Sequence, residues 1–167
     1  MMKKRVLGII LGAVMTMAMS VPAFANENQS QELSVTLVAE PSYTITIPAS
    51  INMGNEGATV DVEATDIKNL PEGNRVSVTI AGTDYYRNQM VLEANTTPRT
   101  SLRYQIISES GEVLETTGQA NQTVGKEVVS FTEDGRKQYK IRPVIAGRFE
   151  YGVAYTGSIT FGIAVTE

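Results

Sequence analysis

The chain of 167 residues contains no cysteine, no histidine and no tryptophan. Without cysteine it has no disulfide bond, no thiol nucleophile and no thiolate ligand for a metal. Without histidine it lacks the usual general base near neutral pH and the commonest metal ligand in proteins. Any aromatic platform for a sugar must therefore come from its 7 tyrosines or 4 phenylalanines.

Other catalytic patterns are missing as well. The sequence has no Gly-x-Ser-x-Gly elbow, no Ser-x-x-Lys pair and no glycine-rich phosphate loop. A serine or threonine nucleophile would have to use a lysine or a carboxylate as its base. We therefore expect a protein that is not an enzyme and that uses no cofactor and no metal.

The first 25 residues have the three-part pattern of a secretory signal peptide. The basic residues Lys3, Lys4 and Arg5 precede the apolar run "VLGIILGAVMTMAMSV", and "AFA" at 23–25 supplies small residues where a signal peptidase reads them. A membrane anchor is the alternative, but the apolar run is short and polar residues follow it. We expect cleavage after Ala25, a flexible N-terminus over residues 26–32, and a secreted or cell-surface protein.

The charge balance is acidic. The leader holds three of the 14 basic residues and none of the 18 acidic ones, which leaves 11 basic and 18 acidic residues in the rest of the chain. An acidic chain without a basic cluster argues against binding to nucleic acid or to anionic membranes. We expect neither partner after the leader is removed.

Apolar and polar residues alternate along much of the chain, which predicts β-strands. The predicted strands cover residues 33–40, 42–47, 58–65, 75–82, 90–94, 102–109, 112–117, 127–131, 138–145 and parts of 147–166. Turns rich in Gly, Pro, Asn and Asp separate them, and no helical stripe occurs beyond the leader. We expect one all-β domain over residues 33–167, an antiparallel β-sandwich of eight to ten strands.

Three connections have specific patterns. Pro48 cannot donate to a sheet ladder, so we expect "TITI" before it in one sheet, "INM" after it in the other, and Pro48 outside both. The loop Asn69–Gly73 holds Pro71 and predicts a passage between the sheets. The Asp134-Gly135 pair in "TEDGR" predicts a hairpin turn.

The acidic residues Asp61, Glu63 and Asp66 are the candidates for a pair of glycosidase carboxylates or a calcium site. Asp61 and Glu63 alternate with valines, which favours a solvated strand face instead. Tyr85 and Tyr86 follow one another on a predicted strand, so their side chains should point to opposite faces. One of them is then exposed, which makes Tyr85 and Tyr86 candidates for binding a sugar or a protein.

Four stretches carry a resemblance to a family. The leader, "SYTITIPASINMG" at 42–54, "NLPEGNRVSVTIAG" at 69–82 and "YTGSITFGIAV" at 155–165 resemble small exported surface proteins of Gram-positive bacteria, related loosely to WxL-type and adhesin-type domains. The resemblance implies an immunoglobulin-like or pilin-like sandwich and an exported location. The WxL signature itself and a sortase signal are missing, so no site residue follows from it.

Together these patterns favour a non-catalytic module of the cell surface or extracellular space, acting in adhesion or surface structure. One alternative is a carbohydrate- or calcium-binding module. Another is a pilin-like subunit that assembles by strand exchange, because the predicted strand Leu33–Glu40 follows a polar tail and could add to a neighbour's sheet edge. The partner would be a protein or a glycan at the cell surface, or a second copy.

Overall fold

The computed structural model describes residues 36–146, 150 and 152–167, and their fold is all-β. The strands are β1 (Ser42–Thr46), β2 (Ala58–Lys68), β3 (Arg75–Thr83), β4 (Val91–Ala94), β5 (Thr100–Ile107), β6 (Val113–Leu114), β7 (Glu127–Phe131), β8 (Gly135–Val144), β9 (Tyr155–Thr156) and β10 (Ile159–Thr166), with a short 3₁₀ helix η1 (Tyr86–Asn88). The predicted signal peptide over 1–25 and the N-terminus predicted to be flexible over 26–32 lie outside the described residues. In the described part of the chain no helix is long and apolar enough to cross a membrane.

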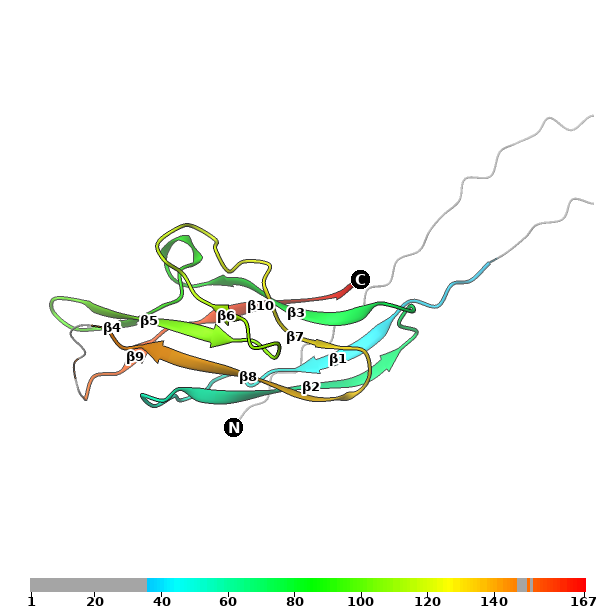
Figure 1. The fold of residues 1–167 in the computed structure, drawn as a ribbon, viewed down its shortest axis with the longest axis horizontal. Coiled ribbons are helices and arrows are strands. Elements are labelled where there is room, and N and C mark those ends of the chain that lie inside the picture. The colour runs from blue at the N-terminus through cyan, green and yellow to red at the C-terminus, as the bar shows by residue number, and fades with distance from the viewer. Residues whose placement is uncertain (1–35, 147–149, 151) are drawn as a thin grey trace, which may run out of the picture.

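The strands form two antiparallel sheets (Figure 1). The large sheet has seven strands in the order β1-β2-β8-β5-β4-β9, with β6 paired to β5, and the small sheet has the order β10-β3-β7. The all-β character and the antiparallel pairing confirm the prediction, and the ten described strands match the expected number. Strand β3 also begins at Arg75, where the alternation in the sequence begins.

The core lies between the two sheets and takes residues from both. Val76, Val78 and Ile80 alternate along β3 and are buried, while Val60 and Val62 do the same on β2. This is the pattern of strands with one face on a core. Because the chain has no cysteine, no disulfide joins the two sheets; apolar packing holds them together, and hydrogen bonds join the strands within each sheet.

Of the three predicted connections, the loop around Pro71 is as predicted, Pro48 is correct in part, and the hairpin at Asp134-Gly135 is wrong. The loop around Pro71 carries the chain from β2 in the large sheet to β3 in the small one, as predicted. The hairpin predicted at Asp134-Gly135 is wrong, because β7 and β8 belong to different sheets. The Asp134 carboxylate instead accepts hydrogen bonds from the backbone N–H groups of Asp66 and Ile67, at 3.1 and 2.8 Å. The turn is thus fastened to the end of β2.

Two predicted strand segments do not form. Pro48 lies outside any ladder, as expected, but Ile51–Met53 is not a strand and joins no sheet. Thr36–Glu40, the described part of the strand predicted over 33–40, is also irregular and fully exposed. Alternation shows which residues could share a face, but a strand needs a neighbour to pair with. In the described part of the chain neither segment forms a sheet ladder.

Candidate functional site

The acidic residues that the sequence suggested for catalysis or calcium do not converge. Asp61 is exposed on β2, and its carboxylate accepts a hydrogen bond from Gln138 Nε2 at 2.7 Å. Glu63 and Asp66 each lie beside a different basic side chain, at 3.6 and 3.7 Å. The interpretation of a solvated strand face is confirmed by these positions. Among the described residues, no group of three or more acidic side chains is close enough to hold a metal ion.

Tyr85 and Tyr86 lie on the turn that follows β3, so their assumed placement on a strand is wrong. Tyr86 begins η1 and is 69% exposed, whereas Tyr85 is half-buried. The guanidinium carbon of Arg87 lies 5.1 Å from the centre of the Tyr86 ring. A cation therefore already covers one ring face of the exposed tyrosine.

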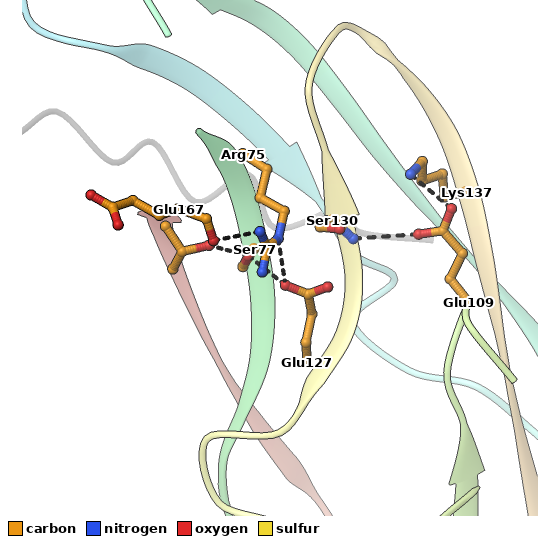
Figure 2. A network of polar contacts seen from close by, with 8 residues as sticks. Arg75, Ser77, Glu109, Glu127, Ser130, Lys137 and Glu167 are labelled. Atoms are coloured by element: carbon orange, nitrogen blue, oxygen red, sulfur yellow. Dashed lines mark hydrogen bonds and ion pairs between the residues drawn. The ribbon is translucent and has the colours of Figure 1, made fainter. Parts of the chain in front are cut away.

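A polar network joins the three strands of the small sheet (Figure 2). Arg75 Nε and Ser77 Oγ donate to the Glu127 carboxylate at 3.1 and 2.6 Å. Thr166 Oγ1 lies 2.6 Å from Ser77 Oγ and is the donor there, because Ser77 gives its single hydroxyl proton to Glu127. Burial raises the pKa of Glu127, but hydrogen bonds from Ser77, Arg75 and Ser130 outweigh it and hold the pKa below its ordinary value. The network is a structural tie between strands.

Glu109 covers the free edge of β7 (Figure 2). Its backbone N–H donates to the carbonyl oxygen of Val128 at 2.9 Å, and its carboxylate accepts from the Ser130 N–H at 3.4 Å. The same carboxylate pairs with Lys137 Nζ on β8 at 2.7 Å. A bare sheet edge invites pairing with other chains. This loop and its ion pair block such pairing at β7.

A cleft of about 520 Å³, lined by apolar and uncharged polar residues, opens between the segment after β1 and the segment that leads into β10. Pro48–Asn55 and residues of Val153–Phe161 line it, and further lining comes from Val60, Leu92, Leu102, Tyr104, Tyr139, Ile141 and Pro143. None of these lining residues carries a charge at neutral pH. The arrangement suits binding of an uncharged, largely apolar group.

Two buried tyrosines line this cleft. Tyr104 is 2% exposed and Tyr139 is 5% exposed, and neither hydroxyl has a hydrogen-bond partner among the described residues. Burial raises the pKa of both phenols well above the ordinary value, and for Tyr104 the negative charge of Asp84 adds to this. Both hydroxyls are therefore neutral and able to donate. Among the described residues the one fully buried side-chain oxygen without a partner is Thr123 Oγ1, so both tyrosine hydroxyls reach solvent and could donate to a ligand in place of water.

Strand β10 lies at the edge of the small sheet beside the cleft. In the described part of the chain its one strand partner is β3. Its side chains Ile159, Phe161, Ile163 and Val165 pack against the core but remain half-buried, and none of the 8 residues of β10 is fully buried. The core is therefore less covered along β10 than along β3 or β7.

Neither the cleft nor the open β10 edge was predicted as a site, because the lining segments lie far apart in the sequence. The one signal in the sequence was the uncharged alternation of Ile159–Thr166. Comparison with known proteins adds nothing to the geometry: no family model, no curated protein and no solved structure matches the chain.

Proposed function

We propose that this protein is an exported, non-catalytic module with an immunoglobulin-like β-sandwich, acting in adhesion or surface structure at the cell surface. In this function the cleft and the neighbouring edge of β10 bind an extended polypeptide. The observation that carries the proposal is the cleft itself, which is uncharged and opens beside β10, whose outer edge pairs with no strand among the described residues.

The chemistry of the cleft supports binding rather than catalysis. Its only titratable side chains among the described residues are tyrosines, and the pKa values of Tyr104 and Tyr139 are raised. A phenol of that kind donates a hydrogen bond but is a poor general base near neutral pH. Apolar lining with a few fixed hydrogen-bond donors is typical of a binding site.

The form of the cleft supports an extended chain as its ligand. A free strand edge binds a peptide through main-chain hydrogen bonds, while pockets beside it take alternate side chains. β10 offers the edge, and the space between Pro48–Asn55 and Phe161 offers the pocket. A glycan is less well matched, because the exposed ring of Tyr86 lies outside this cleft and is covered on one face.

Cell fractionation of the native host tests the proposal, with an antibody against the chain as the detector. Ile51 lines the cleft and is 39% exposed, so Ile51→Lys should leave folding intact and block the cleft. Val124→Lys is the matched control, because Val124 is also 39% exposed but lies elsewhere. We expect the wild-type chain and the control at the cell surface, and the Ile51 variant in the medium.

Two results would overturn the proposed function. One is a wild-type chain that stays inside the cell, which removes export. The other is equal surface retention of the wild type and the Ile51→Lys variant, which removes the cleft from the function.

A further inference from the structure

The segment that enters the domain leaves its apolar side chains in water. Thr36–Glu40 is exposed throughout, with Leu37 94% and Val38 78% exposed. Figure 1 shows it running away from both sheets as it leaves the start of β1. The side chain of Asn69 donates to the carbonyl oxygen of Glu40 at 3.2 Å, which holds the segment in this direction.

The sequence of this segment alternates in the manner of a β-strand. Leu33, Val35 and Leu37 recur at every second position, so in a strand they would share one face, and Leu33–Val38 carries no charge. Such alternation is suited to a sheet with one apolar face. Large aliphatic side chains gain free energy when another surface covers them. The segment is therefore fitted to add to a sheet edge.

The edge of β10 has the matching properties. From Phe161 to Thr166 its register with β3 is regular, and the strand Ile159–Thr166 carries no charged residue. Phe161, Ile163 and Val165 are half-buried at the same two-residue spacing as the apolar residues of the segment. Sheet edges are commonly protected by charges or covering loops, as Glu109 protects β7. β10 has no such cover among the described residues.

We infer that Leu33–Glu40 of a second copy of this chain adds to the edge of β10, with Leu33, Val35 and Leu37 closing the cleft. The inference rests on the proposed function and names the polypeptide that the cleft binds. The apolar side chains of the added segment would then pack beside Phe161, Ile163 and Val165 of β10. Each group would shield the other from water.

The connection to β1 favours a second copy over the chain's own segment. Only Pro41 lies between Glu40 and β1, which belongs to the large sheet, whereas β10 belongs to the small sheet. Packed sheets are about 10 Å apart, and one residue spans less than about 4 Å. The residues next to Pro41 therefore cannot pair along their own β10, and the described part of the segment runs away from both sheets (Figure 1).

Light scattering after size-exclusion chromatography tests the inference on the full chain, expressed with its leader and purified after export. We expect an assembly that becomes monomeric in the double variant Val35→Lys/Leu37→Lys, with the dissociation constant raised about a hundredfold or more. The matched control is Ser34→Lys/Thr36→Lys, which adds the same charge to the opposite face and should remain assembled. Leu37 is exposed in the single chain, so the variant should melt like a wild-type monomer.

A mixing experiment separates the two surfaces. The Val35→Lys/Leu37→Lys variant retains an intact cleft, and the Ile51→Lys variant retains an intact segment, so each should be monomeric alone. Mixed together they should form a dimer with one junction, because one intact segment then meets one intact cleft.

Three results would overturn the inference. They are a wild-type monomer at every concentration, equal effects of the two lysine pairs, or a fall in the melting temperature of monomeric Val35→Lys/Leu37→Lys, which would place the segment on its own domain. If the wild type is monomeric but Ile51→Lys is still released from the cell surface, the inference fails while the proposed function stands with another protein as the partner.

Discussion

Gly57 is the position at which one added methyl group should damage the cleft most. It adopts a φ of 87°, and a Cβ there would lie 2.2 Å from the Ile141 carbonyl oxygen and 2.6 Å from Arg142 Cβ. The left-handed conformation costs an alanine about 1–2 kcal/mol, and pushing β8 aside costs about 1–3 kcal/mol more. Alanine recovers about 0.4–1 kcal/mol by restricting the unfolded chain. Gly57→Ala should therefore destabilise the fold by about 2–4 kcal/mol.

Thermal unfolding followed by circular dichroism measures this loss, which corresponds to a fall in the melting temperature of about 10 °C for a domain of this size. Gly54→Ala is the matched control. Gly54 accepts a hydrogen bond from the Gly57 N–H at 2.9 Å and so closes the same turn, but nothing lies within 4 Å of its added Cβ. Its melting temperature should stay within about 2 °C of the wild type.

Equal melting temperatures for the two variants would refute the close approach of Gly57 to β8. The same result would also contradict the position of Pro48–Asn55, which lines the cleft. If Gly57→Ala melts early but still folds at lower temperature, an extended peptide should bind to it more weakly than to the wild type, because the turn at Gly57 fixes that side of the cleft.

Three further predictions concern charged and phenolic groups. Glu127→Gln should slightly lower the free energy of unfolding at neutral pH. The difference from the wild type should shrink as the pH falls below the ordinary glutamate range, because the folded state holds the Glu127 pKa down and loses that stabilisation when the carboxylate is protonated. Urea unfolding of the two proteins at neutral and acid pH measures this difference. Tyr104 and Tyr139 have raised pKa values, so alkaline titration followed by ultraviolet absorption should ionise them later than the exposed tyrosines, and the fold should lose stability as the pH rises beyond the ordinary tyrosine value. Asp61→Asn and Glu63→Gln should change the free energy of unfolding by less than about 0.5 kcal/mol, since exposed pairs contribute little; a larger change in a urea titration would contradict the solvated face.

The local pattern of the sequence was enough to predict most strands and one crossing between sheets. β3 follows its alternation because Val76, Val78 and Ile80 need one buried face, and a shift by one residue would place them in water. The loop around Pro71 was predictable for a similar reason, since its turn residues lie between two strong strands. These features depend on neighbours in the sequence, and a single sequence contains them.

Pairing partners could not be predicted in the same way. "TEDGR" has the residues of a hairpin turn, yet the chain crosses between sheets there because the Asp134 carboxylate binds the end of β2, 67 residues earlier in the chain. Ile51–Met53 alternates like a strand but has no ladder to join. The cleft could not be predicted from the sequence for the same reason. Its lining depends on which edges remain unpaired, and only the whole topology determines that.

The incomplete burial of the core along β10 matters more because the chain has no cysteine. A domain with no disulfide depends on apolar burial, and yet Ile163 and Val165 on β10 stay half-buried while Leu37 is almost wholly in water. A fully exposed aliphatic side chain gains about 1.5–3 kcal/mol when it becomes fully buried, and the half-buried Ile163 and Val165 would gain part of that. A strand laid along β10 would bury both groups at once, so stability and assembly would be two consequences of one contact. If the inferred assembly forms, this coupling would account for the uncharged edge of β10, because charges that keep a lone monomer from pairing would also prevent the contact that completes its core.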